Sequence, residues 1–197
     1  MERVVSIVAC GPSALKCGAA SAPGFVIAVN DAFQHVRHDA MLSMDGRWAK
    51  HRLPLLMGGD GPVFVRRSAF HHVDAGSCST NTLQRVRVFD NDHAETKFGE
   101  HTHVLNGGNS GYCALNLAYV MRPAVVYLFG FDHKGGHFHP ENEWRQRGEG
   151  CANSPAKFKR WADDCKQARK QFDNVSIRVI NTNPDSHVRA FEFGEAP

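Results

Sequence analysis

A glycine-rich turn that opens into a long apolar segment constrains this chain more than any other stretch. The turn reads Gly-Gly-Asn-Ser-Gly-Tyr over 107–112, an apolar segment follows to Met121, and a second apolar run covers 124–132. Runs of these lengths predict a buried helix and then a buried strand. A strand that is apolar on both faces is typical of a parallel sheet with helices on each side. The sequence therefore predicts an α/β fold.

Other apolar runs supply the remaining elements. Short runs that predict strands cover 4–9, 25–29, 40–44, 62–66, 85–89 and 175–180. Ser154 and Pro155 are typical of a helix cap and a first helical position, and apolar residues recur after them at helical spacing. A length of 197 residues suits one core, and no linker or repeat divides the chain. We expect residues 1–197 to form a single α/β domain with a mostly parallel sheet flanked by helices.

Composition limits the classes of function. The net charge of +3 suits an anionic ligand such as a nucleotide, whereas no long Lys/Arg block predicts nucleic-acid binding. No stretch approaches membrane-spanning length, and no basic leader with a cleavage site follows Met1, so we expect a cytoplasmic chain without a membrane span. The six cysteines form no CxxC pair and are expected to be mostly reduced, structural thiols. The sequence is also compatible with a homo-oligomer.

The expected helix after the glycine-rich turn presents a candidate binding site. A helix N-terminus carries unpaired backbone N–H groups and the positive end of the helix dipole, which together favour a phosphate or a carboxylate. The residues placed to hold such a group are Gly108, Asn109, Ser110 and Gly111. The strand that follows this helix ends in Asp132 and His133, at the sheet edge where open α/β folds place their chemistry.

The first three strands also end in polar residues. Gly11, Pro12 and Ser13 follow the first strand: Gly11 permits close backbone approach, Pro12 suits a first helical position and Ser13 offers a hydroxyl beside free N–H groups. The alternative is a turn that only connects strand to helix. Asn30 and Asp31 follow the second strand and can cap the next helix or reach a ligand. With Asp45 after the third strand, these endings predict one polar crevice at the carboxyl edge of the sheet.

A polar segment with two glycines and three histidines follows Asp132. Residues 132–140 read Asp-His-Lys-Gly-Gly-His-Phe-His-Pro, which predicts a mobile flap over the crevice. An imidazole titrates near neutrality, so His133 and His139 are candidate general bases. The same histidines with Asp132 could instead bind a metal, but alternation on a loop is a weak metal pattern and we assign no metal ligand. Ser186, after the last strand, can cap a short terminal helix or touch the ligand.

The order of these motifs resembles a known group of transferases. The motifs are, in order, a strand followed by Gly-Pro-Ser, a strand followed by Asn, a distant Ser-Gly that opens a helix, and a strand ending in Gly-hydrophobic-Asp. This order is similar to that of the small bacterial sialyltransferases. It also resembles that of the motility accessory factor glycosyltransferases and the hydroxymethylpterin diphosphokinase-like proteins. The likeness covers most of the chain in outline and is carried by four short motifs. It implies a Rossmann-like sheet that binds a nucleotide, commonly the CMP part of a sugar donor, through Gly11, Pro12, Ser13, Asn30, Ser110 and Gly111, with Asp132 at the strand exit.

The chain departs from this family at three places. Cys10 stands where the sialyltransferases have Asn before Gly-Pro-Ser, and Asp45 stands where they have a further Asn. They also place a catalytic His shortly before the late helix, where this chain reads Ala-Asn-Ser over 152–154. The histidines of the flap are the nearby replacements for that base.

These observations favour a transferase that binds a nucleotide or nucleotide-sugar and acts on a small or glycan acceptor. In a glycosyl transfer no metal cofactor is required, because helix N-termini at Ser13 and Ser110 can neutralise the leaving phosphate. A diphosphate transfer would instead use Mg²⁺ held by Asp45 and Asp132. The third alternative is a non-catalytic protein that binds a nucleotide.

Overall fold

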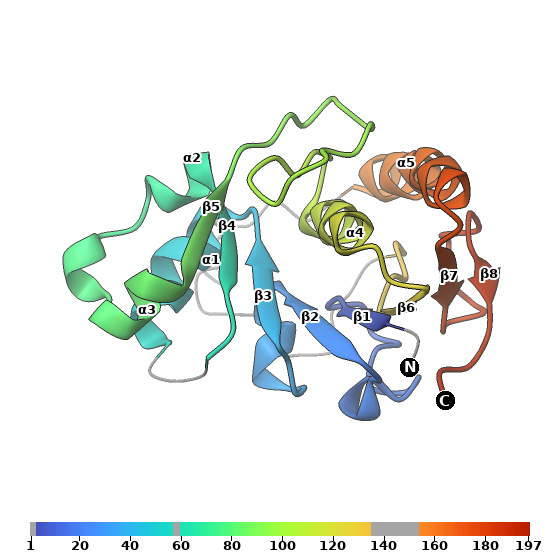
Figure 1. The fold of residues 1–197 in the computed structure, drawn as a ribbon, viewed down its shortest axis with the longest axis horizontal. Helices are drawn as coiled ribbons and strands as arrows, with labels where there is room; N and C mark the ends of the chain where they lie inside the picture. The colour runs from blue at the N-terminus through green and yellow to red at the C-terminus, as the bar shows by residue number, and fades with distance from the viewer. Residues whose placement is uncertain (1–2, 57–59, 135–153) are drawn as a thin grey trace.

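The computed structural model describes residues 3–56, 60–134 and 154–197, which form an eight-stranded sheet flanked by helices (Figure 1). The strands lie in the order β5-β4-β3-β2-β1-β6-β7-β8, and every neighbouring pair is parallel. Their bounds are β1 Val4–Val8, β2 Phe25–Val29, β3 Ala40–Ser43, β4 Val63–Arg66, β5 Val86–Phe89, β6 Val125–Phe129, β7 Arg178–Asn181 and β8 Glu192–Phe193. The predicted α/β fold with a parallel sheet is confirmed.

The helices divide between the two faces of the sheet. The helix α4 (Ser110–Met121) and the helix α5 (Pro155–Asn174) lie side by side on one face (Figure 1). They bury alternate strand residues such as Ile7, Ile27 and Leu128. The intervening strand residues face the other side, where α1 (Gly46–Arg52) and α2 (Arg67–Phe70) pack on Met41, Val63 and Val65. This arrangement explains why the central strands are apolar on both faces.

Both long helices begin where the sequence predicts. Asn109 caps α4 by accepting a hydrogen bond from the Tyr112 N–H at 3.0 Å, and Ser154 caps α5 with Pro155 at its first position. The sequence did not predict the short helices α1, α2 and α3 (Thr80–Arg85), nor the two-residue strand β8. No helix in the described ranges is long and apolar enough to cross a membrane. The five cysteines in those ranges form no disulfide, and Cys151 lies outside them.

The carboxylate of Asp132 ties together the ends of three strands. Asp132 is buried after β6, and its Oδ2 accepts a hydrogen bond from the Ser13 N–H at 2.9 Å while its Oδ1 accepts one from the Ser13 hydroxyl. Asn183, after β7, donates through Nδ2 to Oδ1 at 2.6 Å. The turn after β1 and the segment after β7 are therefore both held at the end of β6.

The helix predicted to begin at Pro12 and Ser13 does not form. Residues 12–18 form turns that lead into a short 3-10 helix, Ala19–Ser21, and the Ser13 N–H and hydroxyl donate to Asp132 instead of opening a helix end. Ser186 is likewise a link within the protein: its hydroxyl donates to the Phe131 carbonyl and accepts from the Val188 N–H at 2.9 Å. No helix follows Ser186 in the described C-terminal range.

Asn30 and Asp31 do not cap the following helix, as the sequence suggested they could. They lie within a 3-10 helix, Asn30–Gln34, whose cap position is Val29. Asn30 adopts a left-handed backbone with φ 51°, and its Oδ1 accepts from the Ser43 hydroxyl at 2.7 Å. Asp31 is buried and pairs with the Arg52 Nε at 2.7 Å. Asp31 therefore serves the fold.

Replacing Asp132 by Ala should destabilise the fold strongly, because the buried donors of Ser13 and Asn183 lose their acceptor. We expect a loss of about 2–4 kcal/mol in the free energy of unfolding, measured by denaturant titration. Asp163→Ala, which removes an exposed carboxylate from α5, is the control and should have a far smaller effect. Equal losses in the two variants would contradict the role assigned to Asp132.

Candidate functional site

A hollow of about 370 Å³ lies at the carboxyl ends of β1, β2, β3 and β6, beside the first turns of α4 and α5. It adjoins the place between β1 and β6 where the strand order changes direction along the sheet. Open α/β sheets form their ligand crevices at such switch points, because the connections on either side leave in opposite directions. The topology therefore marks this hollow as the candidate site.

The hollow gathers most of the residues singled out in the sequence. It is lined by Gly11, Asn30, Asp45, Gly108, Asn109, Ser110, Gly111, Asp132 and His133. Pro12, Ser13 and Asp31 do not line it, and Ser13 reaches it only through its bonds to Asp132. His139 and the expected flap after Lys134 lie outside the described residues. The predicted convergence thus holds for the strand exits after β1, β2, β3 and β6 and for the glycine-rich turn.

One hydrogen bond links the N-terminal turn of α4 to the end of β3, and a second caps the helix. The Ser110 hydroxyl accepts from the Met44 N–H at 3.1 Å, and the Asn109 Oδ1 caps the helix. Because its oxygen is used by the cap, Asn109 presents only its Nδ2, which has no partner. Gly108 leaves space here: a Cβ added to it would lie 3.4 Å from the Trp161 Nε1. The turn, the Asn109 amide and the Trp161 indole therefore converge.

Unpartnered buried polar atoms concentrate in this hollow. In the described ranges, six buried side-chain nitrogen or oxygen atoms lack a hydrogen-bond partner, and four of them belong to residues that line it. They are the Arg66 Nε, the Asn109 Nδ2, the His133 Nδ1 and the Trp161 Nε1. Three of these groups can only donate. Buried donors without acceptors are costly, so the hollow is built for a ligand rich in oxygen acceptors such as a phosphate or carboxylate.

The charged side chains of the lining favour an anion as well. Arg47, Arg66 and Lys157 contribute positive charge. Asp45 is engaged with the protein, since its Oδ1 accepts from the Arg47 N–H at 2.8 Å and its Oδ2 pairs with the Arg47 side chain at 3.4 Å. Asp132 is engaged by Ser13 and Asn183. Because Arg47 pairs with Asp45, the lining sets the charges of Arg66 and Lys157 against that of Asp132, and positive charge is in excess.

The contacts of Asp45 and Asp132 bear on the magnesium site that the diphosphate-transfer alternative requires. The described residues contain no group of three His, Cys, Asp or Glu side chains that could hold a metal ion. Asp45 caps α1, and Asp132 accepts three hydrogen bonds from Ser13 and Asn183. Coordination of Mg²⁺ by either carboxylate would compete with these bonds. Magnesium dependence stays a prediction of the diphosphate-transfer alternative.

His133 is placed to exchange a proton inside the hollow. It adopts a left-handed backbone with φ 49°, stacks on Phe131 and meets the Trp161 ring edge-on, with centroid distances of 6.2 Å to each. Burial lowers the pKa of its imidazole to about 4, although the negative charge of Asp132 opposes that shift. The ring is therefore neutral at pH 7 and can accept a proton.

Sequence patterns did not identify Arg66, His93, Lys157 or Trp161 as lining residues. Arg66 ends β4, so extending the strand-exit argument to a fourth strand would have found it. Trp161 and Lys157 showed only helical periodicity, which does not reveal that the Trp161 Nε1 lacks a partner. His93 belongs to an irregular segment with no pattern, and only the fold brings it to the site.

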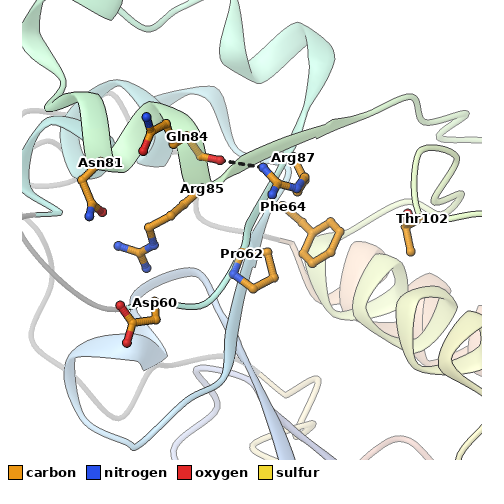
Figure 2. Close-up of a pocket in the computed structure, with 8 residues that line it drawn as sticks. All are labelled: Asp60, Pro62, Phe64, Asn81, Gln84, Arg85, Arg87 and Thr102. Carbon is orange, nitrogen blue, oxygen red and sulfur yellow. Dashed lines mark hydrogen bonds between the residues drawn. The ribbon is translucent and has the colours of Figure 1, made fainter.

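A second hollow, of about 470 Å³, lies at the β4–β5 edge and is shown in Figure 2. Its arginines are held by backbone carbonyls: Arg85 donates to Gly61 at 2.8 Å and Arg87 donates to Gln84 at 2.7 Å. None of the unpartnered buried atoms found in the described ranges belongs to its lining. The hollow at the switch point is therefore the better candidate.

Comparisons with known proteins inform the fold. No family model matches the sequence, and no curated protein matches it. Among solved structures, the fold is similar to that of the sialyltransferase CstII from Campylobacter jejuni, determined in complex with the substrate analogue CMP-3FNeuAc. The TM-score is 0.60 at 11% identity, over 100% of this chain and 87% of that one. The expected sialyltransferase-like fold is confirmed, and at this identity the likeness shows the fold alone.

The lowered pKa of His133 predicts acid-sensitive stability. In the unfolded chain this imidazole should take up a proton near pH 6.5, whereas in the folded protein it does so near pH 4. The unfolded state therefore binds more protons between these values, and stability falls as the pH drops from 6.5 to 4. The substitution His133→Asn suits the left-handed backbone. It should reduce the loss of folding free energy between pH 6.5 and pH 4 by on the order of 2–3 kcal/mol. An NMR titration placing the His133 pKa between 6 and 7 would refute this.

Proposed function

We propose that this protein is a nucleotide-sugar-dependent transferase, a sialyltransferase-like glycosyltransferase that acts on a small or glycan acceptor. The observation that carries the proposal is the convergence of unpartnered donors on the N-terminal turn of α4 at the switch point of the sheet. A fold similar to that of a sialyltransferase bound to a CMP-sugar analogue supports the same ligand class. The donor is proposed to be a nucleotide-sugar, with CMP as its nucleotide part.

The α4 turn holds the phosphate of the donor in this proposal. The dipole of α4, the Asn109 Nδ2 and the Trp161 Nε1 all offer positive charge or N–H donors at one place. These groups are held by the fold before the ligand arrives. They stabilise the negative charge that develops on the phosphate as the sugar leaves.

The exits of β1 and β2 hold the nucleoside. Gly11 brings the backbone after β1 against the turn after β6, and its N–H donates to the Gly130 carbonyl at 3.1 Å. Any Cβ at position 11 would lie 2.2 Å from that carbonyl, so glycine is required by the fold. The Asn30 Oδ1 is fixed by Ser43, which orients its Nδ2 as a donor for the nucleoside.

His133 acts as the general base in this scheme. The acceptor hydroxyl gives its proton to the neutral imidazole, its oxygen bonds to the anomeric carbon of the sugar, and the nucleotide leaves with the bonding electrons. A pKa near 4 makes the free imidazole a weak base. The negative charge of a bound phosphate raises that pKa and strengthens the base when the donor is in place. His139 remains the second candidate for this role.

Two alternatives make different predictions from the same site. A diphosphokinase-like transferase would need Mg²⁺, so a chelator would abolish its turnover, whereas the proposed glycosyl transfer continues in chelator. A non-catalytic nucleotide-binding protein would bind the donor and never turn it over. A donor-consumption assay with and without chelator separates the three.

Gly108→Leu should block the ligand without unfolding the protein. The position has an ordinary backbone, and a Cβ there meets its neighbours at normal contact distances, but the longer side chain enters the hollow beside Trp161. We expect CMP or a CMP-sugar to raise the melting temperature of the natural protein and not that of the variant. Gly76→Leu, at an exposed turn, is the control and should keep the ligand response. A full response in Gly108→Leu would place the ligand elsewhere.

His133→Asn should separate binding from chemistry. Because the imidazole supplies only the proton acceptor, the variant should bind the nucleotide with unchanged affinity and lose about 10²–10⁴-fold in kcat. The measurement is donor turnover with a panel of acceptors, beside calorimetric titration with CMP. His71→Asn, an exposed histidine outside the hollow, serves as the matched control. Unchanged turnover in His133→Asn would remove His133 from the mechanism.

A further inference from the structure

A cluster of basic side chains borders the hollow beside the α4 turn. Arg66 extends from the end of β4, and its Nη1 contacts the His93 Nε2. Lys157, from the first turn of α5, lies over the Trp161 ring at 5.1 Å from its centroid. All three basic residues line the hollow. They come from three separate parts of the chain, so the fold assembles this cluster.

Arg66 is half-buried, and one of its donors lacks a partner among the described residues. No ion pair to Arg66 is formed within the described ranges, and its buried Nε has no hydrogen-bond partner. Its one side-chain partner is a histidine ring rather than a carboxylate. A buried N–H donor is costly without an acceptor, and a donor on a guanidinium bonds most strongly to an anion. A negatively charged group that enters the hollow would supply the acceptor that the Arg66 Nε lacks.

The contact between Arg66 and His93 disfavours a protonated imidazole. Arg66 can only donate, so a hydrogen bond between the two side chains requires a neutral ring with Nε2 as the acceptor. Burial lowers the pKa of His93, the positive charges of Arg66, Lys157 and Arg160 lower it further, and Asp92 opposes them. An anion placed between Arg66 and His93 would reverse this by favouring the protonated ring.

The basic cluster adjoins the α4 turn but uses different donors. A Cβ at Gly108 would lie 3.6 Å from the His93 carbonyl and 3.4 Å from the Trp161 Nε1. The positive charge of Arg66 also acts on Cys113 in the first turn of α4. Two neighbouring groups of donors, one at Asn109 and Trp161 and one at Arg66 and His93, suit a ligand with two anionic groups.

We propose that Arg66, His93 and Lys157 form a second anion subsite, which binds a carboxylate or phosphate distinct from the anionic group held at the α4 turn. The inference rests on the proposed function and narrows its substrate class. The donor carries either an acidic sugar, with a carboxylate, or a second phosphate. A neutral sugar joined through a single phosphate would leave Arg66 without its anion.

The subsite couples ligand binding to proton uptake. Burial and the neighbouring positive charges lower the pKa of His93 in the free protein, and an anion bound beside the ring would raise it. The affinity for a ligand with two anionic groups should therefore rise as the pH falls from about 8 to about 6. The affinity for CMP, which does not reach the subsite, should depend less on pH in this range.

The first experiment follows the His93 imidazole by NMR titration, with inorganic pyrophosphate as the probe. The subsite predicts that pyrophosphate raises the pKa of His93 in the natural protein and has no effect in Arg66→Gln. This readout does not depend on nucleotide binding or on turnover. If pyrophosphate leaves the His93 titration unchanged, the second subsite is refuted.

The second experiment compares CMP, CDP and CMP-N-acetylneuraminate by calorimetry. Arg66→Gln should weaken the ligands with two anionic groups by about tenfold or more and CMP by less than about threefold. CDP and the CMP-linked sugar acid distinguish a second phosphate from a carboxylate. Arg67→Gln, which removes the neighbouring charge outside the hollow, is the control and should change none of these affinities.

The outcomes separate the subsite from the proposed function. Equal weakening of CMP and of the longer ligands in Arg66→Gln would overturn the subsite while leaving nucleotide binding intact. Failure of the natural protein to bind any nucleotide, with a His93 response to pyrophosphate that requires Arg66, would overturn the proposed function and support an anion site at the cluster.

Discussion

The Asp132 carboxylate accepts hydrogen bonds from the turn after β1 and from the segment after β7, and the geometry of the hollow depends on these bonds. They join segments that are 119 and 51 residues apart in the chain. Because the carboxylate is buried, releasing it would leave several donors without partners. The floor of the hollow is therefore fixed by the same interaction that closes the end of the sheet, and a ligand meets donors that are already in place.

Some polar groups of the hollow are hydrogen-bonded within the protein, whereas others have no hydrogen-bond partner among the described residues. Asp45, Ser110 and Asp132 all bond to the protein, whereas the Arg66 Nε, the Asn109 Nδ2 and the Trp161 Nε1 have no acceptor. Elsewhere in the described ranges, few buried polar atoms lack a partner. Natural proteins depart from local consistency chiefly where a ligand supplies the missing contact. The distribution of unpartnered donors is thus the strongest physical sign of function in this molecule.

The fold was largely predictable, whereas the site was only partly so. The apolar runs of β1 to β7 and the capped starts of α4 and α5 carry strong local signals. Each of these strands appears within about three residues of its predicted bounds, and β7 begins at Arg178 rather than at residue 175. The helix expected to begin at Ser13 does not form, and the Ser13 N–H and hydroxyl bond to Asp132, a tertiary partner that no local pattern reveals. Arg66 and His93 meet only in the folded chain, and β8 is too short to leave a periodic signal.

The most direct measurement follows the indole N–H of Trp161 by NMR during titration with a CMP-sugar, because this donor is buried, unpartnered and beside the α4 turn. The proposed site predicts a saturable downfield shift of that resonance as the N–H donates to the ligand, with the indole N–H of Trp48 unchanged. A CMP-sugar that binds without moving the Trp161 resonance, or that does not bind, would contradict the account.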